Sequence, residues 1–221
     1  MPSCAILFAM SKTYPIALVV AGRAVLVVGG GEVAARKVKG LIECEARLTV
    51  VAPQIIPELA ELCESGVCSW VEKSYEASDL EGIELVFAAT NDEDVNVRVS
   101  RDAAEQKLFV NVADRPELCT FYLPSVLRRG SLSIAVSTDG SSPLTARLIR
   151  ESLEGRVDAE MGVFLELLQS WRPQILATLP EDRRRLFWER AHDGQAYEAI
   201  KQGSLDEAQA ALTRHYEELL R

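Results

Sequence analysis

The stretch "AVLVVGGGEVAARKVKGLIECE" (residues 24–45) places an apolar run, a glycine turn and an amphipathic segment directly after one another. The run at 24–29 is apolar on both faces, as in a buried strand of a parallel sheet. The segment at 32–45 has an apolar stripe at helical spacing, formed by Val33, Val38, Leu41 and Ile42. A strand, a tight turn and a helix in this order predict the start of a βαβ unit.

The same alternation continues along the chain. Further strands are expected at 46–53, 68–73, 83–90 and 108–113. Further helices are expected at 57–66 and 92–107, the second of them capped by Asn91 or Asp92. Apolar strands that alternate with helices predict a parallel sheet covered on both faces. Residues 12–113 therefore form an expected α/β domain with a doubly wound, Rossmann-like sheet.

The glycine turn matches the pattern G-x-G-x-x-A through Gly29, Gly31 and Ala34. In a dinucleotide-binding unit the first glycine makes the tight turn, the second lets the backbone approach a pyrophosphate, and the small third residue allows close helix packing. The pyrophosphate then lies at the helix N-terminus. A purely structural glycine turn is the competing interpretation, and the position between a strand and a helix favours dinucleotide binding.

The end of the second strand lacks the acidic residue that usually binds a ribose 2′-hydroxyl, and Pro53 and Gln54 stand there instead. No arginine follows immediately to bind a 2′-phosphate, which favours NAD over NADP. A second loop of the cofactor cradle is expected after the strand at 83–90, with Thr90 and Asn91 as its polar residues. Asn91 is equally suited to capping the next helix.

The stretch "NVADRP" (residues 111–116) places Asp114 between the last strand of the sheet and a proline. An aspartate before a proline serves well as a turn residue. The same position is at the carboxyl edge of the sheet, where Rossmann ligands bind, so Asp114 is also a candidate general base. No histidine occurs in the first 150 residues to take that role. The two roles are compatible.

The pattern changes after Asp114. Two strands joined at "RRG" precede a helix that Ser142 caps, with Pro143 at its first position. A strand pair outside the main sheet must bury its second face, so residues 114–155 are expected to form an α+β dimerisation and substrate-cleft region; a hairpin folded on its own subunit is the alternative. Five arginines and only two acidic residues occupy 115–150, which suggests an anionic substrate, with Arg147 as one contact, unless these arginines simply face solvent.

Residues 156–221 are predicted to form a helical C-terminal domain. Its Trp171, Phe187 and Trp188 are expected in the core rather than on a ligand. Tyr197 and Lys201 form a Y-x-x-x-K pair, the spacing that short-chain dehydrogenases use, but the glycine turn of this chain is not of their type.

The amino-acid composition disfavours several classes of partner and of metal site. Lys and Arg total 24 against 33 Asp and Glu, a formal net charge of −9, which disfavours nucleic acid and anionic membranes as partners. Five cysteines without a CxxC pair and two histidines argue against a zinc site and suggest reduced thiols in the cytoplasm. No run is long enough for a membrane span. Because Met10 precedes the polar "SKTYP", residues 1–9 are expected to be an extension or the result of a wrongly assigned start.

Four stretches in order, "YPIALVVAGRAVLVVGGGEVAARKVKGLIECEARLTVVAP", "AATNDEDVN", "VNVADRPELCTFYLPS" and "AVSTDGSSPLTARLIRESLE", resemble the siroheme synthase family, specifically its precorrin-2 dehydrogenase module in a stand-alone form. The resemblance implies NAD contacts at Gly31, Glu32 and Val33, at Pro53 and Gln54, and near Thr90. It places the catalytic aspartate at Asp114 and implies that Ser137, Thr138 and Ser141 line the substrate cleft. Asp139 departs from the family pattern, in which a glycine is common.

The resemblance implies a cytoplasmic homodimer that oxidises precorrin-2 to sirohydrochlorin with NAD, in a cleft between its domains. Its substrate would be a tetrapyrrole with eight carboxylates, which would explain a basic segment in an acidic protein. Family members often also act as ferrochelatases, and the sequence leaves open whether this chain inserts a ferrous or cobalt ion. Two alternatives stay open: an NAD-sensing regulatory module, and a different NAD-dependent dehydrogenase using Tyr197 and Lys201.

Overall fold

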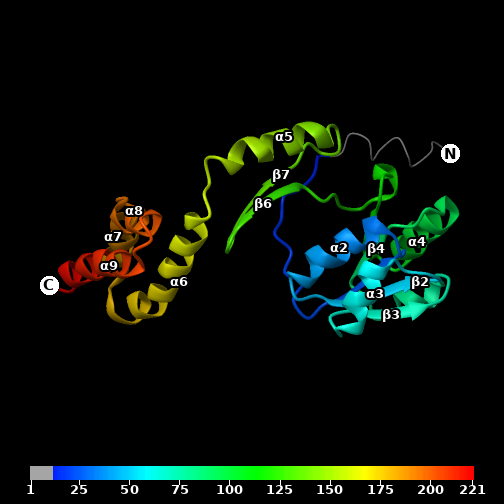
Figure 1. The fold of residues 1–221 in the computed structure, drawn as a ribbon, viewed down its shortest axis with the longest axis horizontal. Coiled ribbons are helices and arrows are strands. Elements are labelled where there is room, and N and C mark those ends of the chain that lie inside the picture. The colour runs from blue at the N-terminus through cyan, green and yellow to red at the C-terminus, as the bar shows by residue number, and fades with distance from the viewer. Residues whose placement is uncertain (1–11) are drawn as a thin grey trace. The chain divides into compact units, whose positions relative to one another are not determined.

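The computed structural model describes residues 12–221, and the chain forms two compact units, with the division between Leu123 and Pro124 (Figure 1). The expectation for residues 1–9 lies outside the described residues. Each unit has its own hydrophobic core, and we describe the two in turn.

A five-stranded parallel sheet in the order β3-β2-β1-β4-β5 forms the centre of the first unit. Its strands are β1 (Ala24–Val28), β2 (Arg47–Ala52), β3 (Ser69–Glu72), β4 (Leu85–Ala88) and β5 (Phe109–Val112). The chain builds outward from β1 to β3 and then returns to add β4 on the other side of β1. This order confirms the predicted Rossmann-like sheet and puts its topological switch point between β1 and β4.

Helices cover both faces of this sheet (Figure 1). Helices α2 (Glu32–Ile42) and α3 (Pro57–Glu64) pack on one face, and α4 (Glu93–Glu105) packs on the other with the short 3₁₀ helix η1 (Ala77–Leu80). Val25 and Val27 of β1 face the α2 side, while Leu26 and Val28 face the α4 side. All four are at most 2% exposed, which explains why the strand is a continuous apolar run.

Two element boundaries differ from the expectation in ways that the backbone explains. The helix expected over 32–45 ends at Ile42, because Glu45 adopts a left-handed φ of +58° where the chain turns into β2. The segment after β5 belongs to the first unit rather than to the next region, since it folds back on the sheet through the 3₁₀ helix η2 (Pro116–Leu118). Thr120 N donates to Val110 O at 2.8 Å, so the first unit ends at Leu123 and not at 113.

The second unit begins with an antiparallel hairpin of β6 (Ser125–Arg129) and β7 (Leu132–Val136), followed by α5 (Pro143–Glu154). Ser142 caps α5 as predicted, because its hydroxyl accepts from Thr145 N at 3.3 Å. Helix α5 packs on the hairpin. On the opposite hairpin face, Val126, Arg128, Ser133 and Ala135 are exposed within residues 12–221.

Four helices complete the second unit: α6 (Glu160–Thr178), α7 (Glu181–Ala191), α8 (Gln195–Lys201) and α9 (Leu205–Leu220). Their core contains Trp171 and Phe187, with Trp188 packed partly buried against it, as expected from the sequence. The hairpin turn lies against α6, since a Cβ on Gly162 would come within 2.9 Å of Gly130 N. The hairpin and the helices therefore lie in one compact unit.

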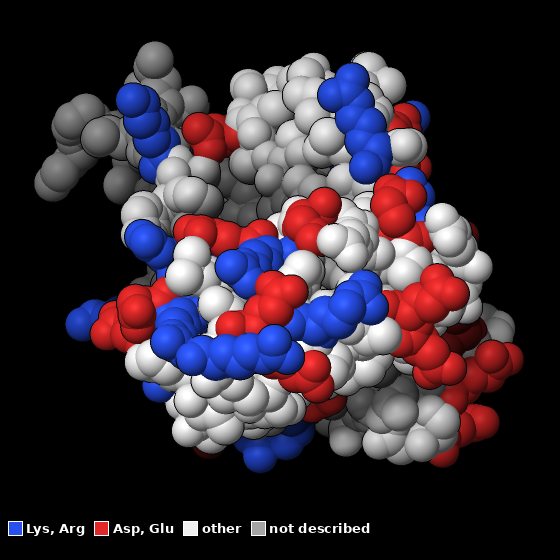
Figure 2. Space-filling model, turned by 90° about the vertical axis from the view of Figure 1, so that its left-hand side faces the viewer, with Lys and Arg blue, Asp and Glu red and all other residues white. Residues whose placement is uncertain are grey.

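The outer side of these helices carries both signs of charge next to each other (Figure 2). Arg190 pairs with Glu218 at 2.9 Å, and Arg185 lies 3.6 Å from Glu189. None of the helices in residues 12–221 combines the length and the apolar character that a membrane crossing requires.

Candidate active site

The three glycines between β1 and α2 meet different surroundings. Gly29 has a φ of +126°, and a Cβ there would lie 2.3 Å from Ala89 O. A Cβ on Gly30 would lie 1.9 Å from Gln54 O. Gly31 has an ordinary extended backbone, and a Cβ there would meet nothing within 4 Å. The fold itself therefore explains Gly29 and Gly30, whereas open space at Gly31 fits a ligand that needs a close approach to the backbone.

The N-terminus of α2 is free to bind an anion. Its N-cap residue is Gly31, and no side chain caps the first turn. By contrast, Asp92 caps α4 by accepting from Asp94 N at 3.0 Å and Val95 N at 3.2 Å. The cap of α4 is thus Asp92 and not Asn91. Since unpaired amides and the helix dipole both favour a phosphate, α2 is the helix that suits a dinucleotide pyrophosphate.

The loop after β2 forms one wall of this turn. Pro53 and Gln54 are both exposed there, and Ile56 N donates to Gly30 O at 2.9 Å. The hydrogen bond fixes the glycine turn to the segment that carries the two predicted cofactor contacts. Glu32 is exposed as the first residue of α2, and Val33 is half-buried against the core.

Asn96, which was not predicted from the sequence, holds the loop after β4 in place. Asn96 is only 5% exposed, accepts from Thr90 Oγ1 at 2.9 Å and donates to Thr90 O at 3.0 Å. Ala89 N also donates to Val28 O at 2.8 Å, so this loop lies beside the glycine turn at the switch point. Thr90 is therefore fixed next to Gly29, while the neighbouring Asn91 is exposed.

Asp114 lies two residues beyond β5 and adopts a left-handed φ of +57° with its side chain exposed. At the carboxyl ends of the strands, Val28 lies beside Ala88, and Ala88 lies beside Val112. Asp114 and the glycine turn therefore come after strand ends at the same edge of the sheet. A clamp behind Asp114 holds the turn: Val112 N donates to Cys119 Sγ at 3.1 Å, and Asn111 Nδ2 donates to Phe121 O at 3.1 Å. Asp114 thus has the backbone conformation of a turn residue and a side chain that solvent can reach.

A second residue that sequence reasoning missed is Lys37 of α2. Its ammonium donates to Asn111 Oδ1 at 2.8 Å and lies 5.2 Å from the centre of the Phe87 ring. Burial lowers the pKa of Lys37 and Arg36 adds to this, while Cys119 and Asp114 oppose the shift. The sequence does contain a sign of this role, since Lys37 stands within the apolar stripe of α2. A helix face that packs on a sheet rarely buries a cation.

The second unit carries the remaining predicted residues on and after the loop between β7 and α5. Ser137, Thr138 and Ser141 hold this loop through their own hydrogen bonds; for example, Ser142 N donates to Thr138 Oγ1 at 3.1 Å. Asp139 has a left-handed φ of +50°, a conformation that glycine adopts most easily. Arg147 is exposed on α5, 3.2 Å from Glu151.

The alternative Tyr197 and Lys201 pair gains no support. The Tyr197 hydroxyl donates to Asp158, and this hydrogen bond raises the pKa of Tyr197 to about 12, away from the range useful for proton transfer near neutral pH. Lys201 lies over the tyrosine ring, 5.8 Å from its centre, and pairs with Glu198.

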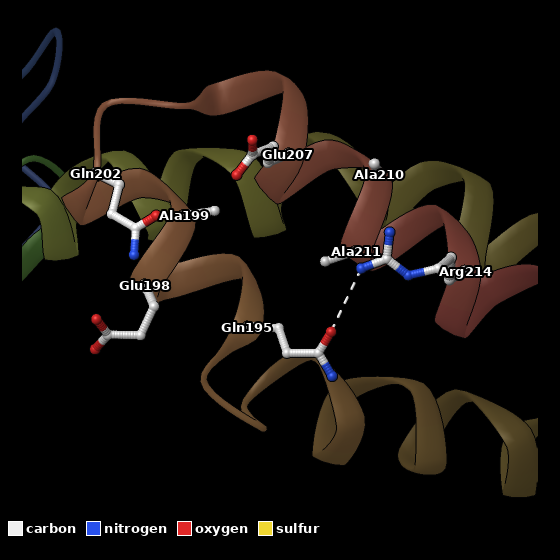
Figure 3. A pocket seen from close by; sticks show the side chains of 8 residues that line it. All are labelled: Gln195, Glu198, Ala199, Gln202, Glu207, Ala210, Ala211 and Arg214. Atoms are coloured by element: carbon white, nitrogen blue, oxygen red, sulfur yellow. Dashed lines mark hydrogen bonds between the residues drawn. The ribbon is translucent and has the colours of Figure 1, made fainter.

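A hollow of about 400 Å³ lies between α8 and α9 and contains none of the predicted residues (Figure 3). Arg214 Nη2 donates to Gln195 Oε1 at 3.4 Å across it. In the described part of the chain, no group of three His, Cys, Asp or Glu side chains is arranged to hold a metal ion.

Three family models match the chain in succession. The model of an NAD(P)-binding domain covers residues 16–125, so the first unit is an NAD(P)-binding domain. The model "Sirohaem biosynthesis protein central" covers 129–156, and "Sirohaem synthase dimerisation region" covers 160–215. The last match falls on helices α6 to α9, whereas the sequence pattern predicts a dimerisation region at 114–155.

Curated relatives and a solved structure agree with these matches. A siroheme synthase of Thioalkalivibrio sulfidiphilus is 41% identical over 92% of this chain, and one of Pseudomonas aeruginosa PAO1 is 42% identical over 88%. This chain spans 42% of the length of each of these two relatives. The structure of SirC, a precorrin-2 dehydrogenase, matches 93% of this chain and 100% of its own, with a TM-score of 0.77 and 30% identity. The chain therefore belongs to the family of the siroheme synthases and of the precorrin-2 dehydrogenase SirC.

Proposed function

We propose that this protein oxidises precorrin-2 to sirohydrochlorin with NAD⁺. The observation that carries the proposal is the carboxyl edge of the sheet, which combines an open glycine turn at Gly31 with an exposed carboxylate at Asp114. Likeness to SirC along nearly the whole chain supports this reaction over an NAD-sensing module, which would need no such carboxylate.

In the first unit, one set of residues would bind NAD⁺ and another residue would accept a proton. NAD⁺, when bound, supplies the acceptor for a hydride. The amides of Gly31, Glu32 and Val33 at the start of α2 would hold its pyrophosphate, with Pro53, Gln54, Thr90 and Asn91 bordering the same edge. Asp114 accepts the proton that the substrate must lose together with the hydride. NAD rather than NADP is proposed because no arginine follows β2 directly.

The anionic substrate accounts for the basic segment of the second unit. Arg147 is exposed on α5, and its ion pair with Glu151 is a surface contact that costs little to exchange. We propose that Ser137, Thr138, Ser141 and Arg147 bind carboxylates of the tetrapyrrole. The hydroxyls would have to rearrange, because they hold their own loop in the absence of substrate.

Metal insertion is a second candidate because the curated relatives are named siroheme synthases. Insertion of a ferrous or cobalt ion requires pyrrole nitrogens to lose protons, and a carboxylate base such as Asp114 suits that step as well. The metal ion would be a substrate in this reaction. We also propose that the protein works as a homodimer in the cytoplasm, with α6 to α9 contributing to the dimer contact, as the family match on 160–215 supports.

The test is to mix the purified protein with precorrin-2 and NAD⁺ without oxygen and to follow the sirohydrochlorin and NADH absorbance together. Equal rates of appearance of both products are expected, with much slower turnover on NADP⁺. Adding Fe²⁺ or Co²⁺ after the oxidation is complete tests chelation separately. Absence of sirohydrochlorin with every nucleotide would exclude the proposed oxidation.

A further inference from the structure

Two cysteines of the first unit face each other away from the glycine turn. Cys63 lies in the last turn of α3 and Cys68 immediately precedes β3, and their Sγ atoms are 2.8 Å apart. A disulfide joins its sulfurs at about 2.05 Å, so a shift of under about 1 Å would bond them. Neither thiol is needed for the reaction proposed above.

The turn between the two cysteines holds this arrangement. Helix α3 ends with Ser65 N donating to Glu61 O at 3.0 Å and Gly66 N donating to Cys63 O at 3.0 Å. Gly66 then reverses the chain with a left-handed φ of +82° and leads it into β3, which pairs in parallel with β2. The thiols are therefore brought together by hydrogen-bonded backbone on both sides of the turn.

The two thiols differ in their exposure to solvent. Cys68 is 7% exposed, and burial, together with a hydrogen bond to Cys63, raises its pKa to about 12. Both cysteines border a hollow of about 510 Å³, and Cys63, which is half-buried, is the more exposed of the two. Because a thiol must be reachable to be oxidised, Cys63 is the sulfur that meets an oxidant first, and Cys68 is positioned to resolve the product.

We propose that Cys63 and Cys68 are a redox-active pair that forms a reversible disulfide with a peroxide as oxidant. The peroxide oxidises the Cys63 thiol to a sulfenic acid, and the first water leaves. The Cys68 sulfur then attacks the Cys63 sulfur, the S–S bond forms as the S–O bond breaks, and the Cys68 proton leaves with the hydroxide as a second water. A dithiol reductant reverses the change by thiol–disulfide exchange.

The disulfide would tie the C-terminal end of α3 to β3. The other end of α3 begins after Ile56, whose N–H binds Gly30 O, and Trp70 of β3 donates to Ala52 O at 3.0 Å. The bond would thus brace the side of the first unit that carries Pro53 and Gln54. Closing this short loop reduces the entropy of the unfolded chain, so the oxidised protein is expected to melt about 3 °C or more above the reduced protein.

The experiment treats the reduced full chain with about one equivalent of hydrogen peroxide and counts its thiols before and after. The expected result is the loss of two thiols, a Cys63–Cys68 peptide bridge by mass spectrometry, and recovery with dithiothreitol. Cys44→Ser, which removes another half-buried thiol, is the matched control and should lose two thiols as well. Cys68→Ser should instead leave Cys63 as a sulfenic acid that dimedone traps.

Two results would overturn the proposal: oxidation of Cys63 no faster than that of Cys44, or a bridge between other cysteines or between two chains. These readouts use no substrate and no nucleotide. They therefore test the cysteine pair whether or not the protein oxidises precorrin-2.

Discussion

Gly30 and Gly31 are neighbours in one turn, yet their surroundings differ. Gly30 is enclosed by the backbone of Gln54 and Ile55, whereas Gly31 faces open space. The G-x-G-x-x-A pattern predicts a function for Gly29 and Gly31 and makes no prediction for Gly30. Only the structure shows that Gly30 is fixed by packing, because the contact comes from a loop more than 20 residues away in the sequence.

Substitutions at these two positions should separate folding from binding. Gly31→Asp is expected to leave the fold intact and abolish NAD binding, because the carboxylate would occupy and repel the pyrophosphate position. Gly30→Ala is expected to lower the free energy of unfolding by about 1–3 kcal/mol, since its Cβ would overlap Gln54 O. Calorimetric titration with NAD⁺ and urea unfolding measure the two effects, and unchanged affinity in Gly31→Asp would refute the assigned cofactor position.

Lys37 is the residue whose role the sequence did not reveal. Lys37→Met keeps most of the apolar stem but removes the hydrogen bond to Asn111 and the charge near Asp114. We expect turnover to fall about tenfold with NAD affinity unchanged, because the Asp114 turn loses one of its supports. Lys37→Arg should recover part of the rate.

Lys39→Met is the matched control for this change, since Lys39 lies on the same helix, is exposed and pairs with Glu58. Steady-state rates of all three variants provide the measurement. Equal turnover in Lys37→Met and Lys39→Met would show that Lys37 does not support the site.

At the scale of elements, periodicity predicted the sheet well because its central strands, β1 and β4, are buried on both faces. β1 is the clearest case, with Val25 to Val28 at most 2% exposed. Prediction was weaker where backbone conformation decides the boundary, as at Glu45 and in the fold-back after Asp114. Periodicity also missed the buried Asn96, because the role of an inward polar residue is evident only from its partner, Thr90.

The N-terminal caps of α2 and α4 differ, and a substitution at the α4 cap tests which of the two helices binds the pyrophosphate. Asp92→Ala removes the side chain that accepts two amides at the start of α4. The free energy of unfolding should fall by about 1 kcal/mol, with NAD affinity within about twofold of the wild type. A large loss of NAD affinity without a loss of stability would mean that α4, and not α2, binds the pyrophosphate.

At the scale of the whole molecule, the second unit exposes apolar side chains within the part of the chain that the structure describes. Leu144 and Leu148 of α5 are 60% and 54% exposed, and Val126 and Ala135 are exposed on the hairpin. The sequence predicted a partner for this region, while the family match for dimerisation lies on α6 to α9. Both observations favour a homodimer, and they differ in where its contact lies.

Sedimentation velocity at micromolar concentration should give a dimer of the full chain. Leu148→Asp places a charge on the exposed face of α5, and Leu176→Asp does the same on α6, where Leu176 is 51% exposed. If α6 to α9 form the contact, Leu176→Asp should weaken the dimer more than Leu148→Asp does. A wild-type monomer at this concentration would contradict the assembly altogether.

The most direct test of the account is a single-turnover oxidation of precorrin-2 by wild type and by Asp114→Asn, each saturated with NAD⁺. Asparagine is nearly isosteric and also tolerates the left-handed backbone at this position, so fold and NAD affinity should be unchanged. The account predicts that sirohydrochlorin forms about 100-fold more slowly or worse in the variant, the usual scale of lost general-base catalysis. A variant that oxidises precorrin-2 at the wild-type rate would show that Asp114 only shapes the turn and that the proton leaves by another route.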